Sequence, residues 1–70
     1  MKRSDEELRH ALFTELTVAK YEGGRLLGLG RRATDVAAEG GQIPIIGRDK
    51  IQRIPTAWLR RKLALEFEKA

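Results

Sequence analysis

The stretch RLLGLGRRATDVAA, residues 25–38, decides the expected fold. Leu26 and Leu27 close an apolar helical face, and Gly28 follows where a left-handed residue commonly ends a helix. Gly30 is an acceptable N-cap, and nothing in residues 31–38 breaks a helix. Two helices joined by a short glycine-containing turn are the outline of a helix-turn-helix, so we expect the rest of the chain to support this unit.

The length and composition restrict the classes of protein to consider. Seventy residues make one small domain, which buries only about 60% of the surface that its unfolded chain exposes. The sequence has no cysteine and no apolar run near the roughly 20 residues that span a bilayer, so a cytoplasmic protein is expected. It shows no nucleophile–His–acid set, paired carboxylates or phosphate-binding glycine loop, so we expect no enzymatic activity, cofactor or metal.

The charge is distributed unevenly along the chain. The net charge is +4, but the segment from Arg25 to Lys62 holds nine basic residues against three acidic ones and carries +6. A basic middle between mildly acidic ends indicates a surface that faces a polyanion. A soluble domain whose basic residues merely cluster is the alternative interpretation.

The first helix is predicted from Asp5 to about Phe13. Ser4 and Glu7 have the spacing of a capping box, in which each side chain binds the other residue's amide. Leucines at positions 8, 12 and 16, with Phe13 beside them, form an apolar stripe. We interpret residues 1–16 as a helical brace for the domain formed by residues 17–70, with a frayed amphipathic segment as the alternative.

A second helix is predicted from Thr17, as its cap, to about Leu27, with Val18 and Tyr21 among its apolar contacts. Gly23 and Gly24 lie in its middle, where each glycine costs up to ~1 kcal/mol relative to alanine. The pair either breaks the helix or allows another helix to cross closely, and we favour the crossing.

The remaining elements follow in the order helix, two strands, helix. A helix from Arg31 to about Glu39 is predicted to end at Gly40-Gly41. Residues 43–46 and 51–54 are short β-branched runs around a polar turn and predict a hairpin, and residues 56–69 predict the last helix. On the helix after the turn, small residues are expected to pack inward and four others to face outward, namely Thr34, Ala37 and Ala38 against Arg31, Arg32, Asp35 and Val36. The expected fold class is α+β, mostly helical.

The last helix carries a second apolar stripe. Leu59, Leu63 and Phe67 recur at four-residue spacing with Trp58 beside them, which is typical of a core face. If this stripe were exposed, the chain would instead be a small protein-interaction module, such as an adaptor or an antitoxin-like partner.

Three pieces of sequence together resemble a known family. Residues 26–32 (LLGLGRR), 41–44 (GQIP) and 53–55 (RIP) occur in the order and spacing found in the small winged helix-turn-helix domains of phage excisionases, within the MerR-like group. The similarity extends over roughly residues 19–65. The family often has an aromatic residue where this chain has Asp35, an acid that must accept from a cytosine amino group or pair with Arg32 to be tolerated near phosphates.

The resemblance implies sequence-specific binding to double-stranded DNA by an excisionase or a transcriptional regulator. It places the helix from Arg31 in the major groove and the wing, residues 48–53, against the DNA backbone or minor groove. A self-association or a recombinase or regulatory partner is expected, because a domain of this size has a small footprint. The DNA-binding residues that it implies are Arg31, Arg32 and Asp35 on the helix and Arg48, Lys50 and Arg53 on the wing.

Overall fold

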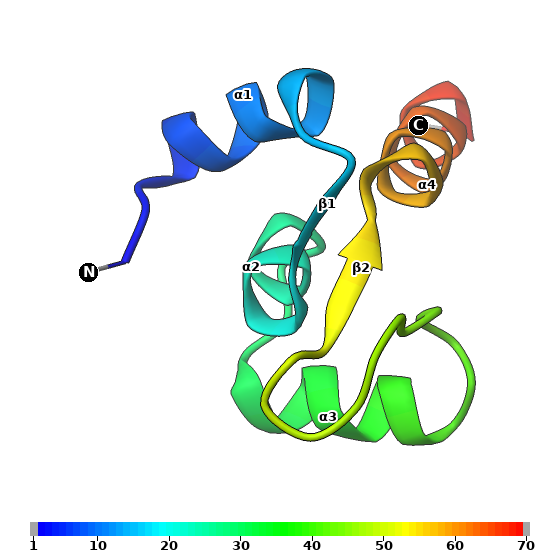
Figure 1. Ribbon diagram of the computed structural model, residues 1–70. Helices are drawn as coiled ribbons and strands as arrows, with labels where there is room; N and C mark the ends of the chain where they lie inside the picture. Colours follow the sequence, from blue (N-terminus) through cyan, green and yellow to red (C-terminus); the bar gives the residue numbers. More distant parts are fainter. Residues whose placement is uncertain (1, 70) are drawn as a thin grey trace.

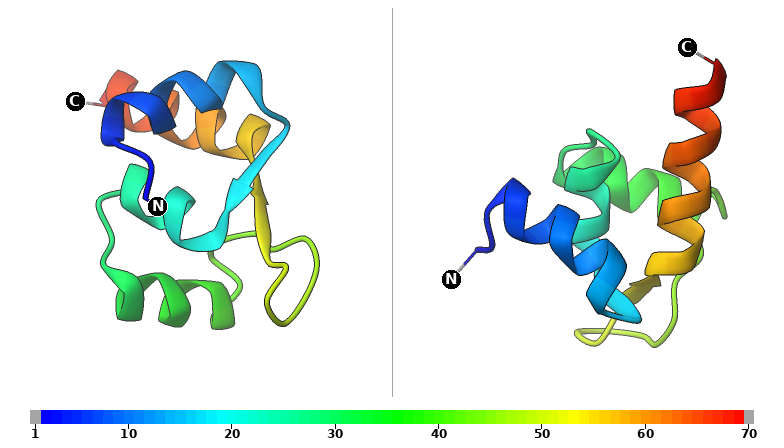
Figure 2. Two further views of the ribbon diagram at one scale, coloured as in Figure 1. Left: turned by 60° about the vertical axis from the view of Figure 1, so that its left-hand side comes forward. Right: turned by 90° about the horizontal axis from the view of Figure 1, so that it is seen from above.

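The structure, a computed structural model, describes residues 2–69, with side chains up to Leu63. It is a mostly helical α+β domain with four helices and one two-stranded antiparallel sheet (Figure 1). Helix α3 and the long segment that follows it lie at one end of the molecule, and α1 and α4 lie at the other (Figures 1 and 2). The elements are α1 (Asp5–Thr14), β1 (Thr17–Ala19), α2 (Lys20–Leu26), α3 (Arg31–Glu39), β2 (Arg53–Pro55) and α4 (Thr56–Lys69).

Helix α1 begins with the predicted capping box. Ser4 Oγ accepts from the amide of Glu7 at 3.2 Å, and Glu7 Oε1 accepts from the amide of Ser4 at 2.9 Å. Its buried face consists of Leu8, Ala11 and Leu12, which pack toward α2 and α4. The N-terminal helix thus contributes directly to the core.

Part of the predicted stripe on α1 is wrong. Leu16 is 90% exposed and Phe13 is 77% exposed. The helix ends at Thr14 and the backbone of Glu15 is extended, so Leu16 leaves the helical face on which the sequence spacing placed it. Phe13 lies five positions from Leu8, which turns it away from the buried face at 3.6 residues per turn.

The predicted start of the second helix is also wrong. Thr17–Ala19 is a strand, paired with β2 in the register Thr17 with Pro55, Val18 with Ile54 and Ala19 with Arg53. Helix α2 therefore starts only at Lys20, and the carboxylate of Glu22 accepts from the Ala19 amide at 3.0 Å. Pairing with a distant strand outweighs the local helical pattern, because it buries Val18 and Ile54 completely.

At the glycine pair in α2, the expected close approach of another helix occurs at Gly24, whereas Gly23 faces strand β2. Both glycines are buried inside the helix, which continues through them. A Cβ on Gly23 would lie 2.5 Å from Ile54 Cδ1, so β2 packs directly onto the helix backbone at this point. Gly24 faces α3 in the same way.

The turn between α2 and α3 has the predicted geometry. Gly28 has a φ of +80°, and the amide of Leu29 reaches back to the Gly24 carbonyl at 2.8 Å. Gly30 is the N-cap of α3, and its carbonyl accepts from the buried Thr34 hydroxyl at 2.8 Å. The helix ends at Gly40, followed by Gly41 with a φ of +78°.

The predicted hairpin is reduced to a single bridge. Ile46 and Arg53 exchange both backbone hydrogen bonds, at 2.8 and 2.9 Å, but residues 43–46 form no strand. Pro44 lacks an amide to donate, and β2 pairs along its length with β1 instead. Residues 47–52, hereafter the 47–52 loop, project beyond this bridge and turn through Gly47 and Asp49, both with positive φ.

Helix α4 follows β2 at Thr56, as predicted. The Thr56 hydroxyl is buried and lies 2.6 Å from the Glu15 carbonyl and 3.0 Å from the Leu16 carbonyl. Arg60 donates to the Leu12 carbonyl, so α4 also caps the end of α1. Leu59 is fully buried and Leu63 packs against the core, whereas the side chain of Phe67 lies outside the described residues.

Candidate nucleic-acid interface

The two arginines at the start of α3 are exposed, as predicted. Arg31 and Arg32 are the first two residues of the helix, and Val36 one turn later is also exposed. Within the described residues, neither arginine forms an ion pair with a carboxylate. Their N–H groups are therefore available for hydrogen bonds to another molecule.

The 47–52 loop adds two exposed basic residues at the same end of the molecule. Arg48 and Lys50 are exposed, and no ion pair within the described part of the chain involves them. The left-hand view of Figure 2 shows the loop projecting beside α3. The start of α3 and the loop beside it therefore each carry two exposed cationic residues.

Arg53 has a different position from the other predicted residues. Its guanidinium donates from Nε to Thr17 Oγ1 and from Nη2 to the Thr17 carbonyl, both at 3.1 Å. The side chain is half-buried and joins β2 to β1 at the base of the loop. Its position suits it to hold the loop in place more than to reach phosphates.

Asp35 is paired, but not with Arg32. One of its carboxylate oxygens, Oδ1, lies 2.7 Å from Lys20 Nζ and 2.7 Å from the Tyr21 hydroxyl, which donates to it. These contacts, that of Lys20 foremost, hold the pKa of Asp35 below its ordinary value. The carboxylate is therefore charged near neutral pH, and a cation of α2 balances its charge.

Lys20 and Tyr21 also contact one residue at the start of α3 and one at the end of the 47–52 loop. Tyr21 lies under the Arg31 guanidinium, whose Cζ is 4.4 Å from the ring centroid, and Lys20 Nζ is 5.3 Å from the same centroid. Lys20 Nζ further donates to Gln52 Oε1 at 3.1 Å, and the Lys20 amide donates to the Gln52 carbonyl at 3.1 Å. The start of α2 thus connects α3 to the end of the 47–52 loop.

The sequence interpretation missed these roles of Lys20, Tyr21 and Gln52. Tyr21 was expected only as an apolar contact, and the other two had no assigned role. Their partners on α3 and in the loop lie 10 to 32 positions away, so no local spacing reveals them. The only signal in the sequence was an acid, Asp35, on an otherwise basic face, which required a compensating cation.

The opposite end of the domain carries a different set of charges. Asp5 pairs with Arg25 at 2.6 Å, and Arg3 bridges Glu15 at 2.6 Å and Glu22 at 2.8 Å. Asp5 of α1, Glu15 just after it and Glu22 of α2 are thus each paired with an arginine, and α1 lies away from α3 (Figure 1). His10 is exposed, as expected.

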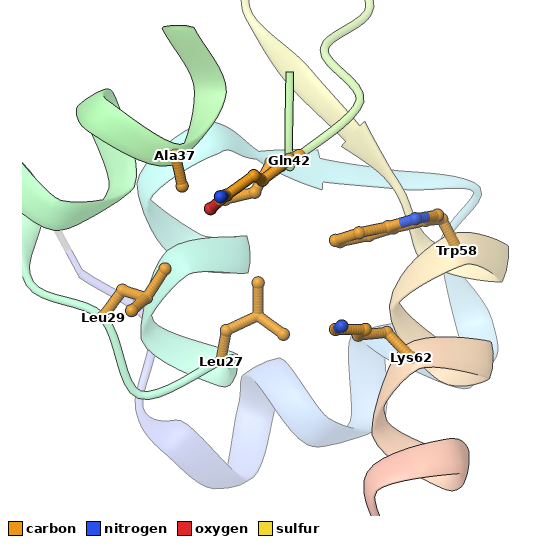
Figure 3. A pocket seen from close by; sticks show the side chains of 7 residues that line it. Leu27, Leu29, Ala37, Gln42, Trp58 and Lys62 are labelled. Carbon is orange, nitrogen blue, oxygen red and sulfur yellow. The ribbon is translucent and has the colours of Figure 1, made fainter. Parts of the chain in front are cut away.

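An apolar groove of about 560 Å³ lies between the α2–α3 turn and α4 (Figure 3). Leu27 and Leu29 line one side, and Trp58 and Lys62 point toward them from α4. The remaining lining residues are Ala37, Gln42 and Ile43. None of the described residues that line the groove carries a carboxylate, thiol or imidazole, so these side chains offer neither a metal-ligand set nor an acid–base pair.

No helix in residues 2–69 combines the length and apolar character needed to cross a membrane. Across the same residues, His, Cys, Asp and Glu side chains nowhere gather in groups of three or more that would suit a metal ion. Comparison of the chain with family models, curated proteins and solved structures gives no match.

Proposed function

We propose that the chain is a winged helix-turn-helix domain that binds double-stranded DNA sequence-specifically. In this proposal α3 enters the major groove and the 47–52 loop is the wing, lying along the backbone. The observation that carries the proposal is the placement of four exposed cations on two neighbouring segments: Arg31 and Arg32 begin α3, and Arg48 and Lys50 belong to the 47–52 loop that projects beside it. The resemblance to excisionase domains supports the same placement.

The geometry of α3 suits reading of base edges. Helix-turn-helix proteins contact bases with residues near the start of the recognition helix, where Arg31 and Arg32 lie. Arginine binds guanine O6 and N7 through two hydrogen bonds, which is the most common specific contact in the major groove. Val36, exposed one turn along, is suited to contact a thymine methyl group.

The charge of the loop suits phosphate contacts. Arg48 and Lys50 neutralise phosphates without reading sequence, which positions the helix over its site. Asp35 does not oppose this, because Lys20 and Tyr21 hold its charged oxygen. The network at the start of α2 thus removes the repulsion that an acid on this face would otherwise cause.

The protein-interaction alternative has less support. It relied on an exposed stripe of Leu59, Leu63 and Phe67, but Leu59 is fully buried and Leu63 packs against the core. An excisionase and a transcriptional regulator would both need the DNA binding proposed here. A recombination assay with a phage-type recombinase and a promoter-reporter assay would separate these two roles.

Fluorescence anisotropy with a labelled random-sequence duplex, at low and moderate salt, tests the proposal. We expect binding at low salt that weakens steeply as salt rises, because bound phosphates release counterions. Selection from a random duplex library should then recover a preferred site. Absence of binding at low salt, or affinity that does not change with salt, would refute the proposal.

A further inference from the structure

Two contacts hold the side chain of Tyr21, one at its hydroxyl and one on the face of its ring. Its hydroxyl donates to Asp35 Oδ1 at 2.7 Å, and its ring lies under the Arg31 guanidinium at 4.4 Å. The same Asp35 oxygen accepts from Lys20 at 2.7 Å, and Lys20 is only 14% exposed. The ring therefore has a fixed orientation, and Arg31 rests on a rigid support.

We propose that Tyr21 is a positioning residue for base recognition. It holds Arg31 in a single orientation, in which the guanidinium can bind a base. Stacking occupies the flat face of a guanidinium and leaves its N–H edge free for the two parallel hydrogen bonds that guanine accepts. An unsupported arginine loses rotamer entropy when it is immobilised, and a stacked one has lost part of that entropy already. This inference rests on the proposed DNA-binding function and assigns the source of its specificity.

The same network includes the wing. Lys20 binds Asp35 with its ammonium and also binds Gln52, at the end of the 47–52 loop, through both its side chain and its amide. The orientation of Arg31 on α3 and the position of the loop therefore depend on one pair of residues at the start of α2. Replacing Asp35 should therefore disturb both Arg31 on α3 and the position of the 47–52 loop.

If Asp35 acted only through its charge, replacing it would strengthen DNA binding instead of impairing recognition. Removing an acid from a DNA-facing surface raises the affinity for every duplex. If Asp35 instead anchors Tyr21, Asp35→Asn also lowers the preference for the selected site over a random duplex. The ratio of the two affinities therefore separates a positioning role from a charge effect.

The test compares variants on the selected duplex and on a random duplex of equal length at one salt concentration. Tyr21→Leu removes the ring, Tyr21→Phe keeps the ring without its hydroxyl, and Arg9→Ala alters an exposed cation on the distant α1. We expect Tyr21→Leu to reduce the affinity ratio about tenfold, within the range for one bidentate contact. Tyr21→Phe should fall between Tyr21→Leu and the wild type, and Arg9→Ala should leave the ratio unchanged.

A double-mutant cycle makes the assignment to Arg31 specific. Arg31→Lys keeps the charge but loses the planar fork, so it should lower the ratio about as much as Tyr21→Leu does. Combining both changes should cost little more than either one, because each removes the same contact. Additive losses would show that Tyr21 acts elsewhere and would overturn the inference.

A readout without DNA guards against a variant that fails to fold. In the wild type, the NMR signal of the Arg31 Nε–H group should be shifted by the tyrosine ring current, and Tyr21→Phe should keep most of that shift. If the shift is absent from the wild type, or if Tyr21→Phe and Tyr21→Leu leave the affinity ratio unchanged, the inference fails while DNA binding stands. If the wild type binds no duplex, the proposed function and the inference fail together.

Discussion

Gly24 and Thr34 approach each other so closely that a Cβ on Gly24 would lie 2.0 Å from Thr34 Oγ1. Thr34 is fully buried, and its hydroxyl is already bound to the Gly30 carbonyl. The threonine therefore has no free rotation with which to make room. This contact fixes the spacing between α2 and α3, and with it the direction in which α3 presents its arginines.

We expect Gly24→Ala to lower the free energy of unfolding by about 1–3 kcal/mol, the usual cost of overpacking a close contact. Gly30→Ser is the matched control, because nothing lies within 4 Å of its Cβ and serine is a good N-cap. Urea denaturation followed by circular dichroism measures both. Equal stability of Gly24→Ala and the wild type would mean that the helices move apart freely.

Thr56 offers a test of the junction between α1 and α4. Thr56→Val keeps the shape but leaves the Glu15 carbonyl without its 2.6 Å partner, which should cost about 1–2 kcal/mol. Thr56→Ser retains the hydroxyl and should lose less, mainly the packing of one methyl group. Thermal unfolding of both variants would distinguish the hydrogen bond from packing, and a smaller loss in the valine variant would contradict the assignment.

The salt dependence of DNA affinity should report the phosphate contacts of the 47–52 loop. If Arg48 and Lys50 each neutralise one phosphate, replacing both with alanine should reduce the slope of log affinity against log salt by about 1.8. Arg9→Ala, on α1, should leave the slope unchanged. A double variant with the wild-type slope would place these side chains away from the DNA.

Stability should fall in acid because of Glu22. Hydrogen bonds from Arg3, foremost, and from the Ala19 amide hold the pKa of Glu22 below its ordinary 4.5. A carboxylate with a lowered folded-state pKa stabilises the fold above about pH 4.5, and this stabilisation is lost as the pH falls through the folded-state pKa.

Unfolding free energies measured from pH 6 down to pH 2 test this expectation. Glu22→Gln cannot titrate, so its stability should depend less steeply on pH than that of the wild type. Glu6→Gln, at an exposed position on α1, also removes one acid but leaves the contact between Arg3 and Glu22 intact, and it is the comparison variant. Equal slopes for the wild type and Glu22→Gln would exclude Glu22 as the titrating group.

The local signals in the sequence predicted most helix boundaries, but not the start of α2. Capping at Ser4, the left-handed Gly28 and the glycine pair at 40–41 act through neighbouring residues, so each can be read from a few positions. Strand β1 could not be predicted in this way. Thr17–Ala19 becomes a strand only because Arg53–Pro55 lies beside it, and no local pattern reports a partner so distant.

The candidate interface, too, was predictable where local sequence decides a residue's position and not where a distant partner does. The exposure of Arg31 and Arg32 follows from their position after a glycine N-cap, so the sequence sufficed for them. The partner of Asp35 could not be predicted, because the sequence allowed either Arg32 or a DNA base. The actual partner, Lys20, belongs to another helix. Arg53 seemed equivalent to the loop cations in sequence, yet Thr17 binds its guanidinium.

The short sheet has a consequence for how the chain folds. Pairing Ala19 with Arg53 closes a long loop of the chain that contains α2, α3 and the 47–52 loop. Forming the sheet therefore carries the entropic cost of closing that loop. Helices alone would fold quickly through local contacts, whereas this ladder adds a long-range step that slows folding. In return, α2 and α3 cannot separate without opening a ladder anchored by Val18 and Ile54, so the two helices and the sheet should unfold as one cooperative unit.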